Sequence, residues 1–185
     1  MWYHTNMNIF ILSEDPVLAA QQQCDQHIVK MPLESAQMLS TVHRLLDGVE
    51  TKKPSKSGKR ILPYWELSGN LEELVYKAAH VKHPCTIWSM LSSENYDWHY
   101  KHFIALCDEF KLRYGKEHLS YTKLADFLKN KPKNMPKGKM TPFAQAMFDD
   151  CKGPDPVVAY KSFYNKYKRK FATWNRGRQQ PTWWK

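Results

Sequence analysis

The spacing of hydrophobic and polar positions is typical of helices along most of the chain. Asp15-Pro16 marks a helix start, with the aspartate as cap and the proline in the first turn, and Asp47-Gly48 marks an end. We expect one helix over residues 15–46, kinked at Pro32 because proline lacks an N–H. Its core face recurs at steps of three and four residues, at Ile28, Met31, Ser35, Met38, Val42 and Leu45.

Similar patterns predict further helical segments along the chain. Ser92 and Gly115 bracket the clearest of them, because serine caps helix starts and glycine follows helix ends. Asp155-Pro156 repeats the cap-plus-proline start. The expected segments cover residues 71–80, 84–90, 92–114, 116–128, 142–148 (a short turn) and 155–171.

Strand signals are nearly absent after residue 12, so the predicted class is all-α. The apolar run MNIFIL at residues 7–12 is expected to be a strand-like segment or a buried extended arm, and the last residues, ATWNRGRQQPTWWK, an irregular aromatic and basic tail. We expect residues 1–185 to form a single compact helical bundle. Two basic, proline-containing segments are expected to be loops, at residues 49–70 and 129–141.

Positive charge dominates after residue 50. The chain holds 28 Lys+Arg and 18 Asp+Glu, a net charge of +10, although the first 50 residues carry six acids and two bases. Three basic clusters lie near residues 52–60, 129–139 and 161–185, the last with tryptophans among its cations. Solvated lysine loops would explain one cluster. Three clusters favour a polyanion partner, and an anionic membrane is the main competitor.

Composition narrows the class further. The aromatic content of 14% excludes a disordered chain, and only 7 glycines exclude a collagen-like one. No apolar run approaches the length of a membrane span, and residues 1–12 do not resemble a signal peptide. We therefore expect a cytoplasmic protein, located in the host cell if the source is a phage. We also expect a monomer. The widely spaced cysteines are expected to be reduced, at Cys24, Cys85, Cys107 and Cys151.

A second stripe of the 15–46 helix carries the candidate chemistry. It lies one residue after the apolar face, about 100° around the helix, at His27, Lys30, Glu34, Gln37 and Thr41. A carboxylate beside an amine can move protons in a dry site, and the amine can attack an electrophilic carbon. An ordinary solvated Glu–Lys pair produces the same spacing, so the pattern alone leaves both interpretations open.

Two motifs resemble the phage pyrimidine-dimer DNA glycosylases of the endonuclease V type. Asp25-Gln26-His27, followed seven residues later by Glu34, is similar to the first helix of that family, which carries its catalytic glutamate there. The C-terminal Pro-Thr-Trp-Trp-Lys at residues 181–185 is similar to a Pro-Thr-Trp-Tyr-Lys near the family's C-terminus. The likeness covers about a third of the chain.

The resemblance implies an all-helical enzyme that kinks duplex DNA, flips a damaged or modified pyrimidine, cleaves its glycosidic bond and breaks the backbone through a Schiff base. On that basis Glu34 is the expected catalytic carboxylate, and His27 contacts the DNA or positions Glu34. Base extrusion costs a few kcal/mol, which phosphate contacts must offset. The expected DNA contacts are Arg176, Arg178, Trp183, Trp184, Lys137, Lys139 and Gln37, with no metal, cofactor or nucleotide.

Two positions depart from the family pattern. The family's nucleophile is the α-amine exposed after its initiator methionine, whereas here six residues, MWYHTN, precede the matching Met7-Asn8. Lys30, one helical turn before Glu34, is therefore the expected substitute amine if burial lowers its pKa. The family's arginine before the glutamate is replaced by Leu33.

Several alternatives stay open. The same fold suits a transferase that joins an amino acid or amine to a modified thymine in phage DNA, or a DNA-binding module without catalysis. The His80/His83 and His99/His102 pairs have the spacing of metal ligands, although capping and packing roles are the more common use. Cys24 with His27 is a weaker candidate for a thiol nucleophile.

Overall fold

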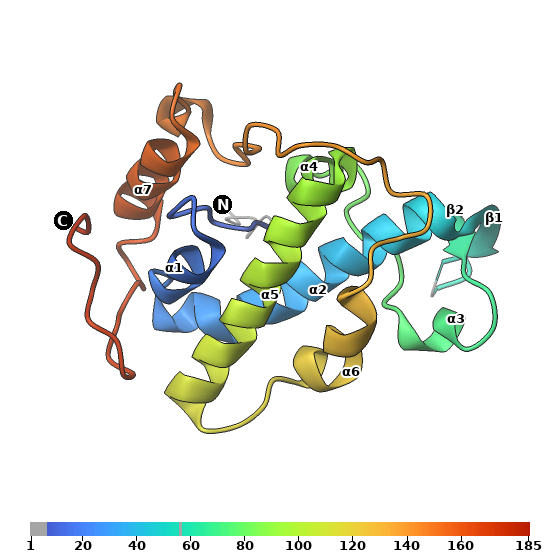
Figure 1. Ribbon diagram of the computed structural model, residues 1–185, viewed down its shortest axis with the longest axis horizontal. Helices are drawn as coiled ribbons and strands as arrows, with labels where there is room; N and C mark the ends of the chain where they lie inside the picture. Colours follow the sequence, from blue (N-terminus) through green and yellow to red (C-terminus); the bar gives the residue numbers. More distant parts are fainter. Residues whose placement is uncertain (1–6, 56) are drawn as a thin grey trace.

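Two long helices cross at the centre of the computed structural model, which describes residues 7–55 and 57–185 (Figure 1). They are α2 (Asp25–Asp47) and α5 (Ser93–Tyr114), and they pack against each other. Shorter helices surround them: α1 (Pro16–Gln21), α3 (Leu71–Leu74), α4 (Pro84–Leu91), α6 (Leu119–Leu128), α7 (Pro156–Tyr167) and the 3-10 turn η1 (Asp149–Cys151). The fold is therefore mostly helical, as predicted.

Most of the expected helix boundaries are confirmed. At these boundaries a side chain close in sequence caps the helix. The Asp15 carboxylate accepts from the amides of Val17 and Leu18, and Asp155 caps α7 in the same way. Ser92 accepts from the Asn95 amide at the start of α5, and Gly115 ends that helix with φ 68°, a conformation that favours glycine.

The single helix expected over residues 15–46 is instead two helices. α1 ends at Gln21, and α2 begins at Asp25 after an extended Cys24. Distant side chains take the carbonyls at the break: Arg113 donates to those of Gln21 and Gln23 at 2.9 Å, and Trp174 donates to that of Gln22 at 3.1 Å. Because these carbonyls accept hydrogen bonds from outside the helix, the chain can end α1 here and begin α2 after three intervening residues.

The expected loop at residues 49–70 contains an antiparallel hairpin, so the all-α prediction is wrong in this segment. Strands β1 (Val49–Pro54) and β2 (Ile61–Glu66) pair from Val49 with Glu66 to Pro54 with Ile61. Gly48 permits the close entry of β1, because a Cβ there would lie 2.4 Å from the Arg44 carbonyl oxygen and 3.1 Å from Trp65 Cβ. Strand-forming residues such as Val49, Ile61 and Trp65 offered a signal that the basic composition obscured.

Four other helix predictions differ from the structure, among them the segment expected over 116–128, which begins only at Leu119 as α6. The segment expected over 71–80 forms only one turn, α3, and residues 142–148 are irregular. α7 ends at Tyr167 rather than near 171. After α3, Arg44 takes the carbonyls of Val75 and Tyr76 at 2.8 and 2.7 Å, so these acceptors are not available to a continuing helix.

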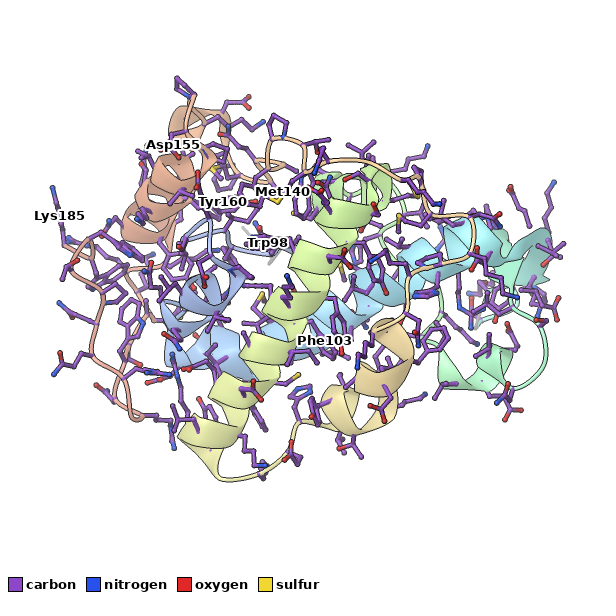
Figure 2. All side chains as sticks on the ribbon, in the orientation of Figure 1. Trp98, Phe103, Met140, Asp155, Tyr160 and Lys185 are labelled. Carbon is purple, nitrogen blue, oxygen red and sulfur yellow. The ribbon has the colours of Figure 1, made fainter. Side chains whose placement is uncertain are left out.

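Residues 7–12, the N-terminal arm, have no regular secondary structure and are buried. The side chains from Met7 to Leu12 are at most 5% exposed and pack with residues of α1, α2, α5 and α7. Gln23 donates from its side-chain amide to the Ile9 carbonyl at 3.0 Å. Tyr160 of α7 points towards the rest of the molecule, and its hydroxyl donates to the Ala144 carbonyl at 2.9 Å (Figure 2).

The second predicted loop and the predicted tail have no regular structure. Residues 129–141 run across helix ends, where Asp47 accepts from the amides of Lys133 and Asn134. The four cysteines are buried and free, as expected. Among the described residues no helix has the length and apolar character of a membrane span. The residues MWYHTN that precede Met7, and Lys56 of the first basic cluster, fall outside the described residues.

Candidate active site

Glu34 lies in the middle of α2 with its carboxylate almost entirely buried. Its Oε1 atom is 2.6 Å from the Lys30 Nζ, one helical turn earlier, and its Oε2 accepts from the Asn8 amide of the N-terminal arm at 3.2 Å. Burial raises the pKa of Glu34, while the contacts with Lys30 and Asn8 and the charge of His80 act in the opposite direction. A carboxyl group in this state can both accept and donate a proton.

Lys30 connects this buried carboxylate to solvent. Its side chain is 41% exposed, against 9% for that of Glu34. The pair is therefore not the solvated helix surface that the spacing also allowed, because only one of its members is on the surface. A substrate that approaches Lys30 meets the amine first and the acid behind it.

His27 faces the core rather than Glu34. Its Nδ1 is hydrogen-bonded to the Tyr164 hydroxyl, and its ring stacks on Phe10 with centroids 4.3 Å apart. Burial holds the pKa of His27 well below its usual value, and the charges of Lys168 and Lys30 lower it further. The neutral imidazole is thus packed in the core, where its hydrogen bond goes to Tyr164 and not to Glu34, the residue it was expected to position.

Lys168 is a second amine that the sequence did not mark as catalytic. It follows α7, is half-buried, and places its Nζ 5.4 Å from the centre of the Phe10 ring and 4.6 Å from that of Phe163. Burial lowers the pKa of Lys168, and the positive charge of Lys30 lowers it further, while Glu34 opposes both. A lowered pKa increases the fraction of neutral, nucleophilic amine.

The C-terminal segment packs against the residues around the start of α2. Asp25 accepts from the Asn175 amide at 2.7 Å, and its own amide donates to the Thr173 carbonyl at 2.8 Å. Trp183 donates to the Gln22 side chain at 2.8 Å. The C-terminal tail is thus hydrogen-bonded to residues just before and at the start of α2.

The tail aromatics pack near His27. The rings of Trp183 and Trp184 are 5.9 and 6.5 Å from that of Tyr164, the partner of His27, and Trp184 also contacts Trp174. Both tryptophans are half-buried against the core. The tail tryptophans therefore pack against Tyr164, the hydrogen-bond partner of His27.

The cations predicted to contact DNA differ in exposure and in their partners within the protein. Arg178 donates from Nε to both carboxylate oxygens of the buried Glu109 at 3.1 Å, so much of its hydrogen-bonding capacity is already used. Arg176 is exposed and lies over the Tyr114 ring at 4.8 Å. Lys139 is 93% exposed and pairs with Glu94 at 3.1 Å.

The two remaining predicted DNA contacts lie apart from this tail. Lys137 is exposed in the 129–141 loop. Gln37 is half-buried, one turn after Glu34, and its carbonyl accepts from Thr41 at 2.7 Å. Of all the predicted DNA contacts, Gln37 is the nearest to Glu34 along the chain.

The histidine pairs have separate partners. His99 lies between the hydroxyls of Ser35 and Ser89, each at 2.7 Å, whereas His83 caps α4 by accepting from the Cys85 amide. In the part of the chain that the structure describes, no three His, Cys, Asp or Glu side chains gather as metal ligands do. The Cys24 thiol is fully buried, and burial raises its pKa, which does not suit a nucleophile.

No protein-family model, curated protein or solved structure matches the chain.

Proposed function

We propose that the protein is a DNA base-processing enzyme of the N-glycosylase/AP-lyase type, which acts on a flipped damaged or modified pyrimidine in duplex DNA. The observation that carries the proposal is the buried Glu34 carboxylate, held between the Lys30 ammonium and the Asn8 amide, with Lys168 nearby. The resemblance of the Asp25-Gln26-His27 and C-terminal motifs, together with the net charge of +10, supports DNA as the substrate.

The proposed chemistry needs one neutral amine and one carboxylate. The amine nitrogen attacks C1′ of the deoxyribose, the bond from C1′ to the base breaks, and the base leaves with the electron pair and takes up a proton. The sugar ring then opens to give a Schiff base between C1′ and the amine. Glu34 removes a C2′ proton, the electrons form a C2′–C3′ double bond, and the 3′-phosphate leaves; water hydrolyses the imine and restores the amine.

Two lysines are candidates for the amine. Lys30 touches Glu34 directly and reaches solvent, whereas Lys168 has the lowered pKa that a nucleophile needs. The position that the resemblance assigns to an α-amine is occupied here by the main-chain nitrogen of Asn8, 3.2 Å from Glu34 Oε2. A chain processed before Asn8 would present its α-amine at that position, so the mass of the natural N-terminus is part of the test.

Borohydride trapping on duplexes that carry an abasic site, a pyrimidine dimer or a modified pyrimidine tests the proposal. We expect a covalent adduct that maps to Lys30, Lys168 or the N-terminus, and Lys30→Met and Lys168→Met separate the two lysines. Glu34→Gln should reduce the chemical rate by about 10²- to 10⁴-fold and leave duplex binding unchanged. Lys101→Met is the matched control, because Lys101 is exposed on α5.

The other outcomes distinguish the competing functions. A mass gain on DNA bases in the presence of an amino-acid or amine donor, with the glycosidic bond intact, would favour the transferase. Strong salt-sensitive duplex binding without any reaction would favour a non-catalytic module. Unchanged chemistry in Glu34→Gln would refute the catalytic role of Glu34.

A further inference from the structure

The β1–β2 hairpin is a well-formed two-stranded ribbon at the edge of the molecule. Figure 1 places it at the far end of α2, opposite α7 and the C-terminus. Its turn is closed by hydrogen bonds from the Ser55 amide to the Arg60 carbonyl and from the Gly58 amide to the Ser55 carbonyl, both 2.7 Å long. Gly58 has φ 71°, which favours glycine in so tight a turn.

Unpaired cations gather towards the tip of this ribbon. Lys52, Lys59 and Arg60 are exposed, and their side chains have no hydrogen bond, ion pair or aromatic contact among residues 7–55 and 57–185. The ribbon's acids lie at its base, where Glu50 is opposite Trp65 and Glu66 is opposite Val49. The tip is therefore a positive surface without an internal counter-charge.

The base of the ribbon is fixed to α2 by a buried arginine. Arg44 is fully buried and donates to the Trp65 carbonyl at 2.7 Å and to the Glu72 carboxylate at 2.8 Å. Tyr64 of β2 donates a further hydrogen bond to Glu72. The ribbon is thus held rigidly at one end and presented to solvent at the other.

We propose that this hairpin binds a groove of duplex DNA to one side of the processed base, with Lys52, Lys59 and Arg60 on phosphates. The major groove of B-DNA admits a two-stranded β-ribbon, and cations that reach phosphates release counterions. The choice of duplex DNA as partner rests on the proposed function. The positive charge at the tip suits a polyanion, and a vesicle measurement distinguishes DNA from anionic lipid, because Ile61 and Leu62 are exposed beside the cations.

The length of α2 sets where the contact falls. The helix runs on from Glu34 to Asp47, which at 1.5 Å per residue is about 20 Å. With α2 laid along the duplex, as the proposal requires, 3.4 Å per base pair places the start of the hairpin about six base pairs from the base at Glu34. It should add affinity only for a duplex that extends at least that far on one side.

Substitution of the tip cations tests the inference in the full chain. The triple variant Lys52→Gln, Lys59→Gln, Arg60→Gln should lower duplex affinity by about tenfold and reduce the slope of log K against log salt by about 2–3. The matched control removes three exposed lysines outside the basic clusters, by Lys101→Gln, Lys111→Gln and Lys116→Gln, and should change the slope by less than about 1.

Cross-linking locates the contact. Ser57 is exposed in the turn and the four native cysteines are buried, so Ser57→Cys provides an accessible thiol for a photo-cross-linker. With a single abasic site in the duplex, cross-links about six or more base pairs to one side support the inference. Cross-links spread evenly along the duplex overturn it.

The outcomes separate this inference from the proposed function. If the full chain binds duplex and the tip variant binds equally well, only the hairpin inference fails. If the tip variant loses affinity for anionic phosphatidylserine vesicles while duplex binding stays constant, the hairpin binds lipid and the inference is again overturned. If duplex binding depends on the tip but no base chemistry occurs, the hairpin inference stands and the proposed enzyme activity fails.

Discussion

Glu34 occupies surroundings that disfavour its own charge. Burial raises the pKa of this carboxyl group, and the Lys30 ammonium and Asn8 amide counter that effect only in part. A structural ion pair on a helix surface would not need such burial, because exposed pairs form without desolvation. Groups held in unfavourable protonation states are typical of active sites, where they lower stability in exchange for reactivity.

Replacement of Glu34 by glutamine should therefore stabilise the protein at neutral pH. The pKa of Glu34 is higher in the folded than in the unfolded chain. Between these two pKa values the folded chain binds more protons, so the free energy of unfolding falls as the pH rises through this range. Glu34→Gln removes this penalty, so we expect a gain of about 1 kcal/mol at pH 7 that shrinks below pH 4.5, the ordinary pKa of the group.

Urea unfolding of both proteins at pH 7 and pH 4 measures this difference. Glu117→Gln is the control, because Glu117 forms an exposed pair with Lys111 and its loss should change stability by less than about 0.5 kcal/mol. A marked loss of stability in Glu34→Gln at pH 7 would mean that Glu34 serves the fold.

At the scale of elements, α2 carries both regions for which we propose a function. Its middle turns carry Lys30 and Glu34, and its last turns carry Arg44, which fastens the hairpin and the segment after α3. Every N–H group of the Arg44 guanidinium has an acceptor within 3 Å, from Trp65, Glu72, Val75 and Tyr76. One buried side chain thus determines how the ribbon is presented.

We expect Arg44→Met to destabilise the protein by about 3–5 kcal/mol, because it leaves the Glu72 carboxylate and four main-chain carbonyls without their partner. Amide hydrogen exchange should show the largest loss of protection in β1 and β2. Arg60→Met, at the exposed tip of the same ribbon, should change stability by less than about 0.5 kcal/mol. A small effect of Arg44→Met would show that the hairpin is anchored by other contacts.

At the scale of the whole molecule, buried histidines make the fold sensitive to acid. Burial lowers the pKa of His27 and His99 well below the usual range, that of His43 to about 4 and that of His102 to about 3. They lie on the two crossing helices, α2 and α5. The neutral rings are packed in the core at neutral pH. Protonation becomes favourable only when unfolding exposes these rings to water.

Stability should therefore fall as pH drops below about 6.5. In that range the unfolded chain binds protons that the folded histidines do not, so the free energy of unfolding decreases towards lower pH. His43 alone should contribute a loss of about 2 kcal/mol between pH 6.5 and pH 5. Urea midpoints across this range measure the slope, and His43→Gln should reduce it. An unchanged midpoint down to pH 5 would contradict the burial of these rings.

The helix boundaries that the sequence predicted correctly depend on neighbouring residues. Asp15, Ser92 and Asp155 cap amides two or three positions away, and Gly115 adopts a conformation set by its own backbone. The failures depend on distant partners. Arg113 and Trp174 break the helix at residues 22–24, and Arg44 ends the helical segment after Leu74. No local pattern records those contacts.

The sequence by itself determined that Lys30 and Glu34 lie on one side of a helix, because their separation of four residues matches the helical repeat. Only the tertiary structure decided that Glu34 is buried against Asn8, that His27 turns to Tyr164 and that the Lys168 amine lies over the Phe10 ring. Burial and long-range contact come from the packing of the arm and α7 against α2. The Asn8–Glu34 contact spans 26 residues and the His27–Tyr164 contact spans 137, and helical periodicity contains no information about either.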